Sequence, residues 1–218
     1  DETYSGNVMP VFEHDIRFEN VWFAYNDEEW VLRDVSFTIP KGHRVAMVGA
    51  SGSGKTTCVS LICGFYHVQK GRILIDGVSI DELDFRAWRR KVGLILQDVI
   101  LFPGPILENI RVYNDSISES QVREAVSIVQ LDDFIRELPD GLDSELAERG
   151  QNVSQGEKQL ISFARALAFE ADVIIMDEAT ASIDPQTEAK IQRTMNRILS
   201  GKTAVIVAHR LTSVLDAD

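Results

Sequence analysis

The stretch Gly49-Ala50-Ser51-Gly52-Ser53-Gly54-Lys55-Thr56-Thr57 directly follows the apolar run Val45-Ala46-Met47-Val48. It matches G-x-x-x-x-G-K-[ST], the spacing of a phosphate-binding loop. Glycines permit a tight turn whose backbone N–H groups converge on phosphate oxygens. Lys55 then supplies a charge for the β- and γ-phosphates, and Thr56 a hydroxyl ligand for Mg²⁺. We therefore expect a buried strand over 45–48 and a helix over 56–63 whose N-terminus faces the anion. The alternative is a Gly/Ser-rich surface turn between a strand and a helix.

The size and charge of the chain narrow its class. Its 218 residues suffice for one sizeable core, or for a main body with a smaller lobe. With 44% apolar and 26% charged residues, the composition is that of a soluble globular protein. The formal net charge of −12 argues against nucleic acid as a partner, because such surfaces usually carry a basic patch.

Neither the cysteines nor the apolar runs indicate a metal site or a membrane span. Cys58 and Cys63 lie five residues apart on the expected helix, and no His/Cys cluster accompanies them. A buried apolar role is therefore favoured over a metal or a disulfide. There is no run of 18 apolar residues and no signal-peptide pattern at the start. Taken alone, the sequence predicts a soluble domain of a reducing compartment.

The first half of the chain is rich in strand patterns. Residues 1–14 are polar and irregular and predict a linker tail. Short alternating runs then predict an antiparallel β-rich opening. The same β character continues after the phosphate loop, with a turn at Asp76-Gly77. The expected strands are 16–18, 21–23, 35–39, 72–75 and 92–96, with a short helix over 85–90.

The second half alternates between helices and buried strands. Ser118 and Gln121 form a capping-box pattern for a helix over 121–129, and 134–138 is a second helical piece. Residues 105–170 thus predict a helical block. Apolar strands follow at 173–176 and 204–208, with a helix over 188–199 between them. The expected class is α/β: a P-loop NTPase core with a parallel sheet covered on both faces, an N-terminal antiparallel β subdomain and an inserted helical subdomain.

Two acids, Asp177 and Glu178, end the apolar strand 173–176. Ligands of open α/β sheets bind at the carboxyl ends of strands, where the phosphate loop also lies. We expect Asp177 to reach Mg²⁺ through water and Glu178 to polarise the attacking water. The alternative is a strand that meets a solvated loop, where acids are common.

The segment Asn152-Val153-Ser154-Gln155-Gly156-Glu157-Lys158-Gln159 resembles the signature L-S-G-G-Q-x-Q of ATP-binding-cassette (ABC) ATPases. Simple phosphate-loop ATPases and GTPases lack this motif. Further pieces stand in the order of that family: Tyr25, Gln97, Asp184 and His209. The phrases Leu96-Gln97-Asp98, Glu108-Asn109-Ile110, Asp177-Glu178-Ala179-Thr180 and Ala208-His209-Arg210-Leu211 look most like exporter-type cassettes, which are normally fused behind a transmembrane domain. The resemblance covers 13–218, so 1–12 is expected to be a linker from a membrane domain.

The resemblance implies a role for each matching residue. Tyr25 would stack on adenine, since an aromatic face reads a base by π-contact. Gln97 would sense Mg²⁺ and the attacking water, and its loop would contact the transmembrane domain. His209 would hydrogen-bond the γ-phosphate. Glu145 matches a loop that links exporters to their membrane domain, and Asp184 would communicate between two ATP sites. The implied catalytic residues are Lys55, Gln97, Glu178 and His209; the implied ATP contacts are Tyr25, Gly49, Ser51, Gly52, Ser53, Gly54, Lys55, Thr56, Thr57, Gln97, Ser154 and Gly156; the implied Mg²⁺ ligands are Thr56, Gln97 and Asp177.

Ser154 also has a purely structural interpretation. With Glu157 it forms a capping-box pattern for a helix over 155–170, and Asp184-Pro185 likewise reads as the start of a helix. In the family, the helix N-terminus at Ser154 contacts the γ-phosphate bound by a second subunit, so two cassettes enclose two ATP molecules. Here Val153, Gln155 and Glu157 replace the usual Leu, Gly and Gln. Glu157 should weaken that contact unless its side chain turns back to cap. A heterodimer with a standard partner and a homodimer that tolerates the variant both remain open.

The sequence thus predicts a Mg²⁺-dependent ATPase domain that powers export, at the cytoplasmic face of a membrane. The family would continue beyond Asp218, which falls inside a helix starting near Leu211, so a C-terminal truncation is expected. A related ATPase acting on DNA or ribosomes would carry a coiled-coil insertion, a basic face or a second cassette, and the acidic sequence shows none. A regulatory module without catalysis is disfavoured by Glu178 and His209.

Overall fold

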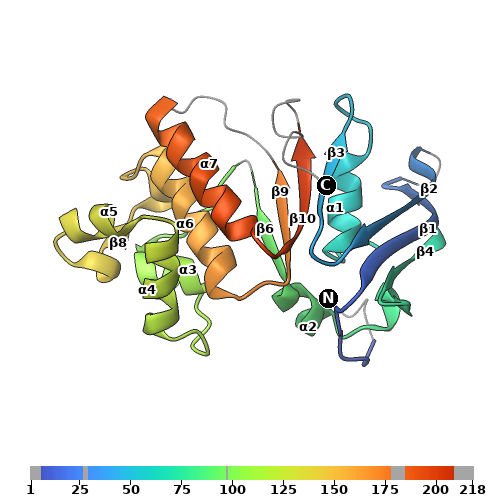
Figure 1. Cartoon of the computed structure of the whole chain (residues 1–218), viewed down its shortest axis with the longest axis horizontal. Helices are drawn as coiled ribbons and strands as arrows, with labels where there is room; N and C mark the ends of the chain where they lie inside the picture. Colours follow the sequence, from blue (N-terminus) through green and yellow to red (C-terminus); the bar gives the residue numbers. More distant parts are fainter. Residues whose placement is uncertain (1–5, 27–28, 97, 178–184, 209–218) are drawn as a thin grey trace. The chain divides into compact units, whose positions relative to one another are not determined.

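The computed structural model describes residues 6–26, 29–96, 98–177 and 185–208 (Figure 1). The predicted residues Gln97, Glu178, Asp184 and His209 lie outside these ranges. The chain divides into two compact units, and each is described by itself. The first comprises 1–92, 172–178 and 201–218, and the second comprises 93–171 and 179–200.

A parallel sheet forms the centre of the first unit. β10 (Thr203–Ala208) lies between β3 (Arg44–Val48) and β9 (Val173–Asp177) and is parallel to both. The side chains of residues 173–176 and 203–207 are buried, as expected for strands covered on their faces. The two predicted apolar strands and their parallel arrangement are therefore confirmed.

β3 differs from the prediction of a buried strand. Residues 44–47 are only half-buried, and Val48 is 56% exposed. The reason is the order of the strands: β3 ends the sheet and pairs with β10 alone among the described strands. An apolar run of four residues does not distinguish an edge strand from a central one.

An antiparallel sheet makes up the rest of the first unit, in the order β2 (Trp30–Pro40), β1 (Asp15–Ala24), β4 (Lys70–Ile75), β5 (Val78–Ser79). The strands predicted at 16–18 and 21–23 are one strand, β1, which shifts register between Phe18 and Val21. Between them Asn20 adopts φ 48°, which explains the break in the alternating pattern. The predicted Asp76-Gly77 turn is confirmed, with φ of 49° and 82°.

Two helices complete the first unit. α1 (Lys55–Ile62) follows β3 and lies between the two sheets (Figure 1). α2 (Phe85–Lys91) follows the short helix η1 (Ile80–Glu82) and is tied to the end of α1, where the buried Trp88 indole donates to the Ile62 carbonyl oxygen at 2.8 Å. Both cysteines are free and buried in the α1 region, as predicted.

The second unit is mainly helical. α6 packs against α3, α4 and α7, and Figure 1 shows α6 and α7 side by side. The predicted capping box of Ser118 and Gln121 is present, and Pro185 opens α7 as expected. The elements in chain order are β6 (Val92–Ile95), β7 (Gly104–Pro105), α3 (Ile106–Arg111), α4 (Glu119–Ile128), α5 (Asp132–Glu137), η2 (Gly141–Asp143), β8 (Glu145–Leu146), η3 (Glu148–Gly150), α6 (Gln155–Ala168) and α7 (Pro185–Leu199). Among the described helices, none is long and apolar enough to cross a bilayer.

Candidate functional site

The phosphate loop connects β3 to α1, as its sequence predicts. Gly52 and Gly54 have φ of 80° and 90°, a region that side-chain-bearing residues rarely adopt. A Cβ at Gly54 would also lie 2.5 Å from Leu32 Cδ2. α1 begins immediately afterwards, and no side chain caps its first turn. Its backbone N–H groups and the positive end of its dipole are therefore directed at the loop, where an anion is favoured.

Lys55 lies over this loop. Its ammonium group donates to the carbonyl oxygens of Gly49 at 2.8 Å and Ala50 at 2.9 Å, and to the Ser53 hydroxyl at 3.3 Å. These three bonds direct all three donors of the ammonium group at the loop. The positive charge of Lys55 is thereby held at the loop, where it would be available to phosphate oxygens once these bonds are exchanged.

Asp177 belongs to the same edge of the parallel sheet as the phosphate loop. Its backbone is paired with Val207 of β10, and Val207 is paired with Met47 of β3, two residues before Gly49. At about 4.8 Å between neighbouring strands, the backbones at Asp177 and Met47 are about 10 Å apart. The structure therefore brings together the loop and the first of the two predicted acids.

The donor set at this edge fits Mg²⁺. Thr56 offers an exposed hydroxyl at the start of α1, and Asp177 offers a carboxylate at the end of β9. Mg²⁺ is usually held by one or two hard oxygen ligands together with water and substrate phosphates. Among the described residues there is no cluster of three His, Cys, Asp or Glu side chains, so nothing there resembles an all-protein metal cage.

Tyr25 follows β1 and reaches the phosphate loop through its hydroxyl group. The Tyr25 hydroxyl lies 3.2 Å from Thr57 Oγ1, although the two residues are 32 positions apart. Thr57 itself is buried, whereas Tyr25 is 49% exposed. The candidate base-binding ring and the candidate phosphate loop are therefore directly connected.

Two residues near Tyr25 were not predicted from the sequence. Gln69 holds the backbone just before Tyr25, because its side-chain amide both accepts from Ala24 N at 3.1 Å and donates to Ala24 O at 2.7 Å. Tyr66 packs its ring against that of Tyr25. In the sequence, the only feature that points to Tyr66 is the pair of aromatic residues Phe65-Tyr66 shortly after α1.

The signature segment belongs to the second unit and starts α6. The Ser154 hydroxyl accepts from Glu157 N at 3.3 Å, and the Glu157 carboxylate accepts from Ser154 N at 2.7 Å. The predicted capping box is confirmed, and Glu157 turns back to cap. Ser154 is exposed and Gly156 is buried. Since a hydroxyl that accepts one bond retains its own O–H, Ser154 can still donate to a phosphate oxygen.

Asn152, the first residue of the signature segment, makes two hydrogen bonds that were not predicted from the sequence. Asn152 accepts from Ala147 N at 2.9 Å and donates to Glu145 O at 3.0 Å. The exposed Glu145 belongs to β8 and is paired there with Pro105 of β7. The residue that matches the linking loop of exporters therefore lies in a short paired strand, with its backbone carbonyl held by Asn152.

Arg165 connects α6 to the segment that follows Gln97. Its guanidinium group donates to Asn109 O at 3.0 Å and to Ile100 O at 3.3 Å. Burial lowers the pKa of Arg165. Asn109 is itself fully buried and binds the backbone of Phe102 in both directions, at 2.8 and 2.9 Å. The signature helix and this segment are therefore one hydrogen-bonded assembly.

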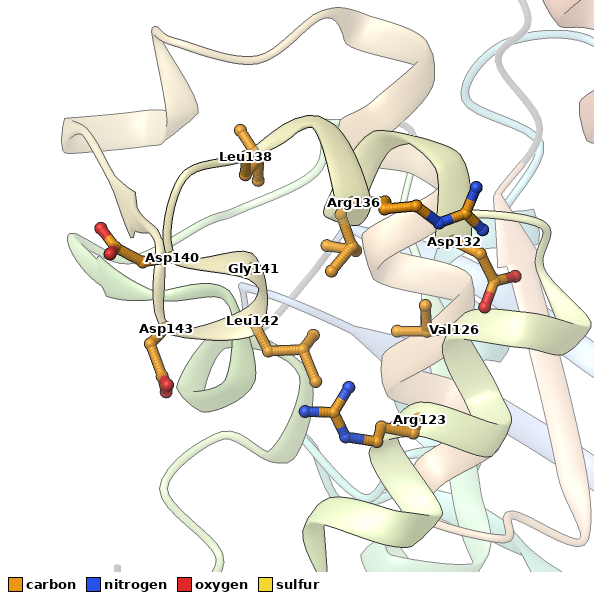
Figure 2. A pocket seen from close by; sticks show the side chains of 10 residues that line it. Arg123, Val126, Asp132, Arg136, Leu138, Asp140, Gly141, Leu142 and Asp143 are labelled. Carbon is orange, nitrogen blue, oxygen red and sulfur yellow. The ribbon is translucent and has the colours of Figure 1, made fainter.

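A surface hollow of about 440 Å³ lies in the second unit and is lined from α4, α5 and η2 (Figure 2). Its two guanidinium groups are already paired, Arg123 with Glu119 at 2.5 Å and Arg136 with Asp133 at 3.1 Å. The apolar side chains Val126, Ile135 and Leu142 are buried. The lining also includes three carboxylates, Asp132, Asp140 and Asp143, and we assign the hollow no chemistry.

The sequence of this chain is similar to those of known proteins. The family model described as ABC transporter matches residues 32–181. The chain is 47% identical over 204 residues to an uncharacterized ABC transporter ATP-binding protein, YknV, of Bacillus subtilis, covering 94% of this chain and 34% of that protein. It is 41% identical to the mitochondrial iron-sulfur clusters transporter ATM1 of Yarrowia lipolytica, covering 100% of this chain and 31% of that protein.

The fold of the chain is also similar to that of a solved structure. A bacterial Atm1-family ABC exporter with ATP bound is 37% identical, with a TM-score of 0.90, covering 99% of this chain and 38% of the exporter chain. The chain thus spans about a third of the length of the relatives that it matches.

Proposed function

This chain belongs to the ABC transporter family, as an exporter-type ATP-binding domain, and from that premise we propose that it hydrolyses Mg²⁺-ATP to drive export through a membrane domain. The observation that carries the proposal is the shared edge of Lys55, Thr56 and Asp177 in the first unit. This edge combines a charged phosphate loop with oxygen ligands for a divalent cation.

Each residue at this edge has a role in binding Mg²⁺-ATP. The Lys55 ammonium exchanges its loop carbonyl partners for the β- and γ-phosphate oxygens, while the N–H groups at the start of α1 bind the remaining charge. Tyr25 offers a half-exposed ring for the adenine base. Thr56 and Asp177 hold Mg²⁺, which neutralises negative charge on the phosphates when bound.

Hydrolysis also needs a group that orients and polarises water. By the family resemblance this is Glu178, with Gln97 and His209 contacting the water and the γ-phosphate. In the sequence, Glu178 directly follows Asp177, the last residue of β9. That position supports the assignment, because ligands of parallel sheets bind at these strand ends.

A second ATP-binding domain would complete the site. Ser154 and the N-terminus of α6 would contact the γ-phosphate bound by that second domain. The Glu157 carboxylate accepts a hydrogen bond from Ser154 N within the capping box. The side chain that departs from the family signature is therefore turned back onto its own helix and is not directed at the phosphate of a second domain. This supports a pair of identical chains over an obligatory heterodimer.

A membrane domain would pack on the segment after Gln97. Ile100, Phe102, Val112 and Tyr113 are exposed apolar side chains in this part of the second unit. Val112 and Tyr113 both have positive φ, at 52° and 54°, and such strain is often retained at functional sites. An apolar segment of a membrane domain would cover them, which would place the chain at the cytoplasmic face of a membrane.

Nucleotide binding tests the proposal directly. We expect Lys55→Ala to abolish tight Mg²⁺-ATP binding in calorimetry, and the exposed turn variant Lys41→Ala to bind as the unaltered chain does. Glu178→Gln should bind ATP yet release no phosphate. A normal dissociation constant for Lys55→Ala would contradict the phosphate-loop assignment, and normal turnover by Glu178→Gln would contradict the choice of base.

The pairing of chains is tested by concentration. Two identical chains that share sites should give an ATPase rate that rises with the square of chain concentration until the dimer saturates. A specific activity that does not change with concentration, or none at all without a second kind of cassette, would contradict the identical pair.

A further inference from the structure

The ring of Tyr25 is packed between two other aromatic rings. Its centroid lies 4.9 Å from that of Phe23, with the ring planes at 89°, and 5.1 Å from that of Tyr66, at 86°. Phe23 and Tyr66 also contact each other, at 5.5 Å. Near-perpendicular pairs at these distances have the favoured edge-to-face geometry. The three rings therefore fix the orientation of Tyr25.

The hydroxyl group of Tyr25 and the backbone that precedes it are held in place as well. The Tyr25 hydroxyl is hydrogen-bonded to Thr57 Oγ1 of the phosphate loop. The Gln69 side-chain amide is hydrogen-bonded to both the N–H and the carbonyl oxygen of the preceding residue, Ala24. Even so, Tyr25 is 49% exposed and Tyr66 is 46% exposed. The Tyr25 ring is thus restrained from one side and open to solvent on another.

We propose that Tyr66 is a positioning residue for nucleotide binding: it holds the Tyr25 ring in the orientation that stacks on the purine of ATP. This rests on the proposed function of Tyr25 as the base-stacking residue. An exposed tyrosine that turns freely loses side-chain entropy when a base stacks on it. A ring held in place before the ligand arrives has already lost that freedom, and affinity increases accordingly.

The chemistry also predicts which ligands are affected. Stacking uses the π-face of the base and does not read its hydrogen-bonding edge, so ATP and GTP should depend on Tyr66 to similar extents. Inorganic tripolyphosphate has no base and should not depend on Tyr66 at all. This difference separates positioning of the ring from general support of the phosphate loop.

The neighbouring residue provides a matched control. Phe65 is also aromatic and 50% exposed, but its ring contacts the Arg89 guanidinium group at 5.5 Å. Replacing Phe65 therefore removes an exposed ring from the same turn, and the contacts of Tyr25 with Phe23, Tyr66 and Thr57 stay intact.

The test is calorimetric binding of Mg²⁺-ATP and Mg²⁺-tripolyphosphate to the chain and its variants. We expect Tyr66→Ala to weaken ATP binding about threefold to tenfold, the range for an aromatic pair, with tripolyphosphate unchanged. Tyr66→Phe should restore ATP binding, and Phe65→Ala should match the unaltered chain. Adding Tyr66→Ala to Tyr25→Ala should cause no further loss. Tyr66→Leu, which fills similar space without a ring edge, should behave as Tyr66→Ala. It replaces Tyr66→Ala in the binding measurements if the alanine variant does not fold.

Three results would overturn the proposal: equal losses for ATP and tripolyphosphate, no loss of ATP binding in Tyr66→Ala and Tyr66→Leu, or additive losses in the double variant. Failure of the underlying function would look different. In that case the unaltered chain would bind neither ligand, or Tyr25→Ala would bind ATP as tightly as the unaltered chain. A weakened Tyr25→Ala beside a normal Tyr66→Ala would overturn the role of Tyr66 alone.

Discussion

The Glu157 carboxylate accepts a hydrogen bond from the backbone N–H of Ser154 at 2.7 Å, and the Ser154 hydroxyl accepts one from the N–H of Glu157. Two N–H groups at the start of α6 are thereby satisfied reciprocally. The acid lies in the first turn of the helix, where the dipole favours negative charge. Glu157, which replaces the usual Gln of the family signature, thus caps the helix of its own chain.

The capping box predicts that glutamine replaces Glu157 without loss, because both side chains can accept the bond from Ser154 N. Glu157→Gln should leave the free energy of unfolding within about 0.5 kcal/mol, and Glu157→Ala should lower it by about 1 kcal/mol. Urea unfolding followed by circular dichroism measures both. Glu124→Ala, an exposed acid on α4, is the control. Equal destabilisation by glutamine and alanine would argue that the carboxylate charge matters more than the cap.

The buried thiols should be chemically inert. Burial raises the pKa of Cys58 to about 11 and that of Cys63 to about 12. At pH 7 the reactive thiolate is then about one part in ten thousand or fewer. We expect iodoacetamide to modify neither residue in the folded chain and both in urea, as read by mass spectrometry. Rapid modification of the native chain would contradict the burial of α1.

Asp76 should make stability depend on acid pH. Desolvation raises its pKa, but the N–H groups of Glu13, His14 and Asp15 all donate to the carboxylate, and the net pKa lies below the usual 3.8. Because the folded pKa is the lower one, this contribution is present above pH 3.8 and is lost as the pH falls through the folded pKa.

Asp76→Asn tests this dependence and retains a residue that tolerates the positive φ of this position. After discounting for solvent screening, we expect a loss of about 1 kcal/mol at pH 7, shrinking towards zero in acid. Urea titrations at several pH values measure the difference, with the exposed Asp143→Asn as control. A loss that is the same at every pH would show that the charge of Asp76 plays no part.

A side chain at Gly54 should cost stability and disturb the phosphate loop. Its φ of 90° opposes alanine, and so does Leu32 Cδ2, which would lie 2.5 Å from the added Cβ. We expect Gly54→Ala to lower the free energy of unfolding by about 1 kcal/mol and to weaken ATP binding, because the loop must change shape. Gly77→Ala, also at positive φ but with open space around it and far from the loop in sequence, should destabilise similarly and leave ATP binding intact.

Local patterns in the sequence predicted local structure well. The capping boxes at Ser118 and Ser154 span four residues each, and both form as expected. The strand over 173–176 is apolar throughout, and its burial follows from that composition alone. The glycine spacing of the phosphate loop required particular φ values at Gly52 and Gly54, and the structure has them.

Features that depend on distant contacts were not predictable in this way. The burial of β3 depends on its place at the end of the sheet, which its own residues do not encode. The surroundings of Tyr25 depend on Thr57, Tyr66 and Gln69, which are brought to it by the β1–β4 pairing and by α1. For Glu178 the assignment as base rests on the family resemblance and on its place after Asp177.

Asp177 and Thr56 should act together on one cation. We expect each of Asp177→Asn and Thr56→Val to abolish most of the gain in ATP affinity that Mg²⁺ provides, leaving binding in EDTA unchanged. Because both residues serve the same ion, the double variant should lose little more than either single variant. Asp172→Asn is the matched control, since Asp172 directly precedes β9 at its opposite end and pairs with Lys91 at 2.7 Å. Calorimetry with and without Mg²⁺ measures all four variants. Equal weakening in Mg²⁺ and in EDTA would mean that Asp177 supports the strand end rather than the metal, and additive losses would place the two side chains on separate functions.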